Sequence, residues 1–219
     1  MRPRDFASLL CACVLAGCAT TTGPRLATAP DDSPERWPPR PAAYRDAASY
    51  PEALRAWRTP EDVSAWMGAR FNYDASRAVL LSESSRARSA APPIHRPADF
   101  FAAPSGMCLD LARFAVETMA TIDARLEPAY LMIEFEPVTI AGETVRLHWL
   151  ALFKRDARYY FVGDSKRPGH VAGPYASAQA FVDEYARYRQ RKVVAFREVA
   201  SYERRQRTPA GRTERRPAT

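Results

Sequence analysis

Residues 104–122 read PSGMCLDLARFAVETMATI, and this stretch decides the fold that we expect for the chain. Pro104, Ser105 and Gly106 interrupt regular structure, and the residues that follow carry apolar side chains at the spacing of one helical face. The apolar positions of that face are Leu111, Ala112, Ala115, Met119 and Ile122. Cys108 therefore lies in the first turn of a predicted helix.

The segments before this stretch predict further helix. Thr59 and Pro60 supply a cap and a first-turn proline, and apolar residues then recur at helical spacing through Phe71. A shorter helix is expected over residues 47–57. Residues 74–103 are polar and interrupted by prolines, so we expect a long surface loop there.

The segments after it predict a sheet. Four strand-like runs cover residues 130–136, 144–153, 158–162 and 193–199, and a helix over residues 177–189 precedes the last of them. Helices followed by an antiparallel sheet indicate an α+β domain, which we assign to residues 44–202.

The start of the chain has the pattern of an export signal. Arg2 and Arg4 precede an apolar run over residues 6–17, which is too short to span a bilayer. Leu15-Ala-Gly-Cys18 resembles the lipobox of bacterial lipoproteins, which implies removal of residues 1–17 and acylation of Cys18, for example by palmitate. Ala19, by the same resemblance, implies the outer membrane, with the domain facing the periplasm. The alternative is an ordinary secretory signal with a chance cysteine.

Both flanks of the domain have the composition of unfolded segments. Residues 18–43 contain six prolines and form a predicted tether. Residues 203–219 contain six arginines and two glutamates, and carry most of the net charge of +7. We expect no nucleic-acid partner for an exported protein. The tail either faces anionic lipid or cell-wall polymer, or is simply solvated.

Cysteine usage draws attention to one thiol. Cys11 and Cys13 leave with the signal and Cys18 is acylated, so Cys108 is the one remaining thiol of the expected mature chain. A thiol at a helix N-terminus is favoured as the nucleophilic thiolate, and the nearby N–H groups can hold an oxyanion. The alternative is a small buried hydrophobic residue.

A cysteine nucleophile needs a base, and the chain has three histidines. His148 lies in an otherwise apolar strand, where an imidazole needs a partner. A three-residue loop over residues 155–157 would place Asp164 opposite His148, and a loop one residue different would change that partner. His170 lies in a turn-like segment and competes as the base, and His95 lies between prolines.

These residues together resemble a known family. Gly106-Met-Cys-Leu-Asp-Leu-Ala112 is similar to the Gly-x-Cys-x-Asp-x-Ala motif of transglutaminase-like cysteine enzymes, and a His-Trp strand and an Asp follow in order. The resemblance implies a papain-like fold, with the cysteine helix packed on an antiparallel sheet. It also implies Cys108 as the nucleophile, His148 as the base and Asp164 as the orienting acid.

Two further residues match more loosely. Tyr73 is the nearest match to a tyrosine that precedes the cysteine helix in this family, which implies a role at the oxyanion site. Asp110 matches the motif, and its expected role is that of a first-turn acid that complements the helix dipole. Two features depart from the family: Leu150-Ala-Leu-Phe153 follows the histidine, and Gly163-Asp164-Ser165 stands where Asp-Pro is commoner.

We therefore expect a lipid-anchored periplasmic cysteine hydrolase, a peptidase or amidase that forms a thioester and acts on envelope peptides or proteins. We expect a monomer with no cofactor and no metal. One alternative is a catalytically inactive scaffold of the same fold. Another is a peptidoglycan amidase of the NlpC/P60 type, although that family has Asp-Cys-Ser-Gly where this chain has Met107-Cys-Leu-Asp110.

Overall fold

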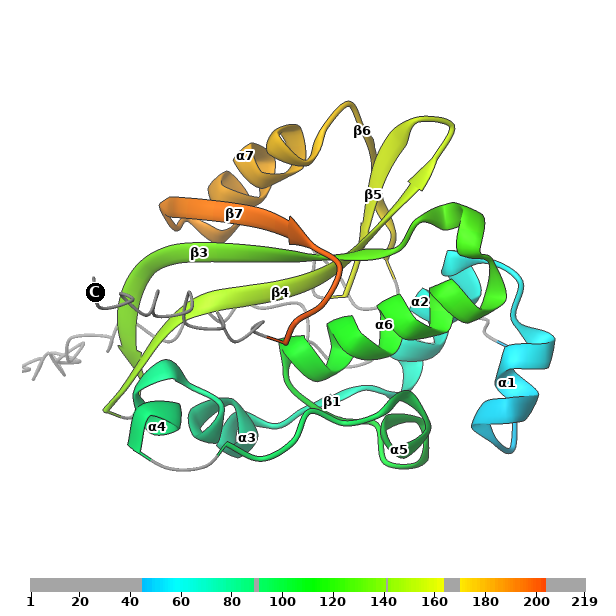
Figure 1. Cartoon of the computed structure of the whole chain (residues 1–219), viewed down its shortest axis with the longest axis horizontal. Helices are drawn as coiled ribbons and strands as arrows, with labels where there is room; N and C mark the ends of the chain where they lie inside the picture. Colours follow the sequence, from blue (N-terminus) through cyan, green and yellow to red (C-terminus); the bar gives the residue numbers. More distant parts are fainter. Residues whose placement is uncertain (1–44, 89–90, 141, 164–169, 204–219) are drawn as a thin grey trace, which may run out of the picture.

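A computed structural model describes residues 45–88, 91–140, 142–163 and 170–203 of the chain (Figure 1). The helices are α1 (Tyr50–Ala56), α2 (Pro60–Arg70), α3 (Ala75–Leu80), α4 (Glu83–Arg88), α5 (Pro97–Ala102), α6 (Cys108–Ile122), the 3-10 turn η2 (Ala124–Leu126) and α7 (Ala178–Arg189). The strands are β1 (Asn72–Tyr73), β2 (Ser105–Gly106), β3 (Ala129–Ile140), β4 (Glu143–Arg155), β5 (Arg158–Val162), β6 (Ala172–Tyr175) and β7 (Val193–Val199). The architecture is mixed α+β, as the sequence predicts.

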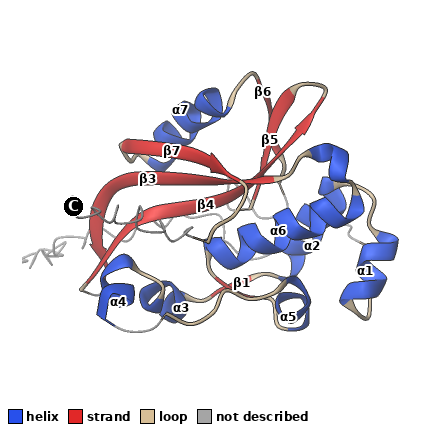
Figure 2. Cartoon of the chain, in the orientation of Figure 1, coloured by secondary structure: helices blue, strands red, loops and turns tan. Residues whose placement is uncertain are grey.

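An antiparallel five-stranded sheet forms the centre of the domain, in the order β6-β5-β4-β3-β7. The helices lie on its two faces: α6 and the helices before it on one face, and α7 on the other (Figure 2). A separate parallel pair, β1 with β2, leads into the start of α6.

Side chains on successive residues of β4 point to opposite faces of the sheet. Trp149, Ala151 and Phe153 pack with the core beneath α6, which we call the α6-side core. Leu150 and Leu152 pack with the core beneath α7, which we call the α7-side core.

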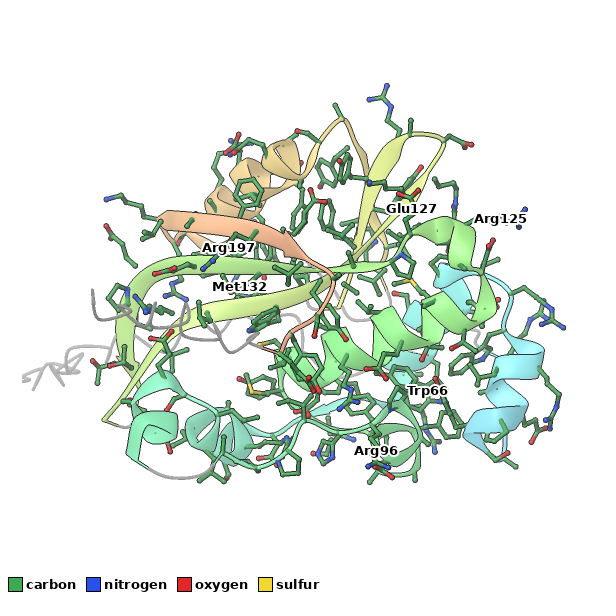
Figure 3. The ribbon with its side chains drawn as sticks, in the orientation of Figure 1. Trp66, Arg96, Arg125, Glu127, Met132 and Arg197 are labelled. Carbon is green, nitrogen blue, oxygen red and sulfur yellow. The ribbon has the colours of Figure 1, made fainter. Side chains whose placement is uncertain are left out.

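The α6-side core is rich in aromatic rings, and Trp66 of α2 lies near its centre (Figure 3). The indole of Trp66 stacks on Phe101 with ring centroids 4.8 Å apart, and lies the same distance from Phe114 of α6. Thr59 and Asp62 form a capping box at the start of α2, so this helix begins where the sequence predicts.

The expectation of a long loop over residues 74–103 is wrong, because α3, α4 and α5 lie within that range. Asp74 caps α3 by accepting a hydrogen bond from the Arg77 amide at 2.9 Å. Pro97 is the first residue of α5, where a missing N–H costs nothing. One of the prolines that led us to expect a loop, Pro97, therefore begins a helix instead.

Strand β6 is also absent from the sequence prediction, since three of its four residues, Ala172, Gly173 and Pro174, are poor strand formers. It lies at an edge of the sheet, where proline is tolerated. The sequence predictions of α1, α2, α6, α7 and the four longer strands are confirmed in type and approximate position.

Candidate active site

Cys108 is the first residue of α6, as the sequence predicts, and the residue is 6% exposed. Met107 precedes it as the N-cap in an extended conformation. The amides of the first turn have no acceptor one turn earlier within the helix, so this end of α6 carries partial positive charge. A thiolate or an oxyanion at Cys108 would be stabilised by that charge.

Asp110 holds the start of α6 in place. Its fully buried carboxylate accepts two hydrogen bonds from the Arg77 guanidinium, at 2.7 and 2.8 Å. It also accepts the backbone N–H groups of His95 at 2.9 Å and Met107 at 3.1 Å. Four donors from three segments therefore converge on one carboxylate beside the thiol.

Burial by itself would raise the pKa of Asp110, but the hydrogen bonds from Arg77, His95 and Met107, and the charge of Arg77, hold that pKa below its usual value of 3.8. The sequence interpretation of Asp110 as a first-turn acid was incomplete. The carboxylate is a buried structural group that joins α3, the segment before α5 and the N-cap of α6.

Gly106 is required by the same packing. A Cβ on Gly106 would lie 2.9 Å from both Cβ and Oδ2 of Asp110, which is closer than side-chain atoms approach. The Gly-x-Cys-x-Asp pattern thus has a physical reading: the glycine makes room for the carboxylate, and the carboxylate fixes the backbone on which the cysteine sits.

Tyr73 lies beside this motif. It pairs with Gly106 in the parallel β1–β2 ladder, and the Asp74 amide donates to the Gly106 carbonyl at 2.7 Å. The backbone of Tyr73 is thus adjacent to the residue two before Cys108. Its role at the oxyanion site stays a prediction.

His148 lies on the α7 side of β4. It pairs with Ile133 of β3, and shares its face with Leu150 and Leu152. The imidazole is buried, and its Nε2 lies 3.1 Å from the hydroxyl of Tyr185 on α7. The two rings also stack, with centroids 5.7 Å apart.

The predicted register of the β4–β5 hairpin is wrong by one residue. Arg155 pairs with Arg158 across the two-residue turn Asp156-Ala157, so the turn is shorter than expected. Both turn residues have positive φ, the backbone of a type I′ turn, and alanine gives no sequence signal for that conformation. The register therefore does not place residue 164 opposite His148.

Asp164 itself lies outside the described residues, but the residue before it does not. Gly163 ends the described part of the hairpin with φ +122°. A Cβ there would lie 3.5 Å from the Leu150 side chain and 3.9 Å from the Leu111 side chain. Leu150 is two residues from His148, and Leu111 is one turn from Cys108. Gly163 thus lies near side chains of both β4 and α6.

The remaining histidines have other surroundings. The ring of His95 lies 6.5 Å from that of Phe100, and its backbone amide binds Asp110. His170 is exposed. A cavity of about 520 Å³ lies between α1, α2 and α5, with Tyr50, Trp66 and Phe101 among its lining residues, and Cys108 and His148 are not among them.

The described residues bear on metal binding and on membrane-spanning helices, but not on the predicted lipid anchor. Within the described ranges, no group of three His, Cys, Asp or Glu side chains could hold a metal ion. No helix in the same ranges is long and apolar enough to cross a bilayer. Cys18, the tether over residues 18–43 and most of the tail over residues 203–219 lie outside the described part of the chain.

The chain matches no family model and no curated protein. The site therefore rests on its own geometry. Sequence reasoning missed Arg77, Tyr185 and Arg189. Arg77 had no signal, because it lies in a segment taken for a loop. Tyr185 had one: a tyrosine on the inner face of α7 needs a polar partner when buried.

Proposed function

We propose that the chain is a cysteine hydrolase, a peptidase or amidase of the transglutaminase-like type, with Cys108 as its nucleophile. The observation that carries the proposal is the fixed start of α6. A thiol occupies the first helical position, and the backbone before it is held by a buried carboxylate with four donors. Fixing a nucleophile beside a helix N-terminus is what acyl transfer requires.

The neighbourhood of Gly163 supports the same proposal. A Cβ built on Gly163 would lie 3.5 Å from the Leu150 side chain and 3.9 Å from the Leu111 side chain, so the last described residue before Asp164 lies near both the histidine strand and the cysteine helix. Strand β5 pairs only with residues 151–155 of β4, so no described strand covers that edge of β4 at His148. In the proposal, the base comes from β4 and the orienting acid from the segment that follows Gly163.

The proposed reaction has two halves. The Cys108 thiolate attacks an amide carbonyl, first-turn N–H groups of α6 stabilise the oxyanion, and the His148 imidazolium gives its proton to the leaving amine. Water then attacks the thioester, His148 takes a proton from it, and the acid leaves as the thiol reforms. In this proposal Asp164 orients the imidazole, and Tyr73 lies beside the oxyanion.

The proposal includes a location. Acylation of Cys18 would anchor the domain to the periplasmic face of the outer membrane, with residues 18–43 as the tether. The substrate class is then a peptide or protein of the cell envelope, acted on by a monomer.

The test is hydrolysis by the purified full-length chain. β-Casein and purified peptidoglycan are incubated separately, and new termini are identified by mass spectrometry. We expect cleavage of casein that is lost in Cys108→Ala and reduced at least about 10²-fold in His148→Gln, the smallest effect usual for a general base. His170→Gln is the matched control and should keep full activity.

A second function has one observation in its favour. Cys108 is only 6% exposed, which suits a non-catalytic scaffold that binds an envelope polymer or protein. Absence of cleavage in both substrates, together with an inert Cys108 thiol, would favour that function. Release of stem-peptide fragments from peptidoglycan alone, dependent on Cys108, would instead favour a peptidoglycan amidase.

A further inference from the structure

A cavity of about 520 Å³ lies between α1, α2 and α5, and the proposed function makes no use of it. Cys108 and His148 are not among its lining residues. Its volume lies within the range of about 300–1,000 Å³ that is usual for sites that bind small molecules. The cavity is therefore a candidate for a second binding site, separate from the cysteine.

Three aromatic side chains supply an apolar wall of the cavity, and contacts with each other and with α6 hold them in place. Trp66 stacks on Phe101 with ring centroids 4.8 Å apart, and lies the same distance from Phe114 in the α6-side core. The ring of Tyr50 lies 5.9 Å from that of Phe101, and its hydroxyl lies 3.0 Å from that of Thr118. The wall is thus formed before any ligand arrives, which reduces the ordering that binding would otherwise cost.

Small side chains leave the room beside these rings. Ala47 and Ala48 line the cavity from the segment before α1, and Ala98 and Ala102 line it from α5. A larger side chain at any of the four positions would fill part of the space. This part of the lining suits an aromatic or aliphatic group of a ligand.

Two charged side chains also line the cavity. Arg70, the last residue of α2, is exposed, and its guanidinium forms no ion pair or hydrogen bond with any residue that the structure describes. Asp46 is exposed as well, and accepts the Ala47 N–H at 3.0 Å through Oδ1. A guanidinium is matched to a carboxylate, which it binds through two parallel hydrogen bonds, whereas a carboxylate accepts N–H groups.

We propose that this cavity binds the C-terminal residue of a peptide whose last side chain is apolar. The terminal carboxylate pairs with Arg70, and the amide N–H of the same residue donates to Asp46. The apolar side chain enters the cavity against Tyr50 and Phe101. The two opposite charges fix the direction of the peptide, because Asp46 repels the carboxylate that Arg70 attracts. The inference is independent of the proposed function, since it involves no residue of the proposed catalytic site.

The first test compares three probes on the purified full-length chain, with dissociation constants from ligand-observed NMR titrations. N-Acetyl-L-phenylalanine has the carboxylate, the apolar ring and the amide N–H, and we expect it to bind most tightly. N-Acetyl-L-phenylalaninamide has a neutral amide in place of the carboxylate. It should bind at least about 10-fold more weakly, since it loses a hydrogen bond between two charged groups. Octanoate keeps a carboxylate and an apolar chain but has no N–H, and should also bind more weakly than the acetylated amino acid.

The second test assigns the binding to the cavity. Arg70→Met keeps an unbranched side chain and removes the charge, so this variant should bind the acid and the amide equally. Arg187→Met, at an exposed position of α7, is the matched control and should keep the 10-fold difference. Ala98→Leu adds bulk to the cavity from an exposed position of α5, and should abolish saturable binding of all three probes.

Equal binding of the acid and the amide by the wild-type chain, or no saturable binding of either, would overturn the inference. An Arg70→Met chain that still prefers the acid, or an Ala98→Leu chain that binds like the wild type, would overturn it as well. Tighter binding of octanoate than of the acetylated amino acid would assign the cavity to a fatty acid and contradict the peptide ligand. Probe binding and casein cleavage are measured separately, so this inference can fail while the proposed function stands, and the reverse.

Discussion

The two faces of the central sheet bury polar groups in different ways. On the α6 side, Asp110 and Arg77 form a buried ion pair, and the carboxylate also binds the backbone that precedes Cys108. On the α7 side, the buried polar group is His148, and its partner Tyr185 is itself held by Arg189. The polar group on the α6 side holds the backbone before Cys108, whereas the polar groups on the α7 side hold the His148 side chain.

This difference matters for function and for stability. The α6-side pair is charged, so removing one partner leaves an uncompensated buried charge. The α7-side cluster joins the Tyr185 hydroxyl to the His148 imidazole and to the Arg189 guanidinium, and its loss removes orientation more than fold. We therefore expect α6-side substitutions to act mainly on stability and α7-side substitutions to act mainly on the reactivity of Cys108.

The largest effect is expected at Asp110. Asp110→Ala leaves Arg77 and two backbone amides without their acceptor, and should lower the free energy of unfolding by about 3–5 kcal/mol. Urea denaturation measures the change. Glu136→Ala removes an exposed carboxylate that pairs with Lys192, and should have little effect. A similar small loss in both variants would contradict the structural role of Asp110.

Gly106→Ala tests the packing against Asp110 more gently. The added Cβ meets the carboxylate at 2.9 Å, so we expect a loss of about 1–3 kcal/mol by overpacking. Gly142→Ala is a useful comparison, because that glycine has positive φ but open space around it. Slower alkylation of Cys108 in Gly106→Ala, but not in Gly142→Ala, would link the strain to the thiol. If Gly106→Ala is as stable as the wild-type protein, the packing of Gly106 against Asp110 does not exclude a side chain.

A substitution on the α7 side should have a small effect on stability and a larger effect on the reactivity of Cys108. Tyr185→Phe removes one buried hydroxyl, and we expect a loss of only about 1–2 kcal/mol in urea denaturation. Its effect on alkylation of Cys108 should be larger, relative to stability, than that of Gly106→Ala. A Tyr185→Phe protein that loses stability without losing reactivity would remove the distinction between the two faces.

The smallest effect is an acid dependence of stability. Because the pKa of Asp110 is lower in the folded protein, its contribution to stability is present above the unfolded pKa, near 3.8, and is lost as the pH falls through the folded pKa. The midpoint temperature for thermal unfolding of the wild-type protein should therefore fall as the pH is lowered below about 4. Asp110→Asn should be less stable at pH 7 and less sensitive to acid. Parallel curves for the two proteins would assign the acid dependence to other carboxyls.

The two faces also differ in how much of their structure can be predicted from the sequence. The start of α6 is encoded locally, since Gly106 and Asp110, which pack against each other, lie two residues before and two residues after Cys108. The apolar periodicity that predicts α6 and the four long strands is likewise a local feature of the sequence. The Arg77 partner lies in a segment whose prolines suggested a loop, so the ion pair could not be predicted.

The surroundings of His148 depend on register and on distant segments. The turn Asp156-Ala157 is one residue shorter than expected, and that error moves every cross-strand partner of the hairpin. Tyr185 is 37 residues from His148, and only the packing of α7 on the sheet brings them together. Sequence patterns report local periodicity, and they carry little information on such pairings.

The most direct measurement of the central claim is the alkylation rate of Cys108 by iodoacetamide at pH 7, in the folded full-length chain and in a synthetic peptide with the sequence of residues 104–112. If Cys108 is an activated nucleophile, it reacts faster in the folded protein than in the peptide, and His148→Gln removes the advantage. A folded protein whose Cys108 reacts no faster than the peptide would contradict the account and leave Cys108 as a packed residue of a binding domain.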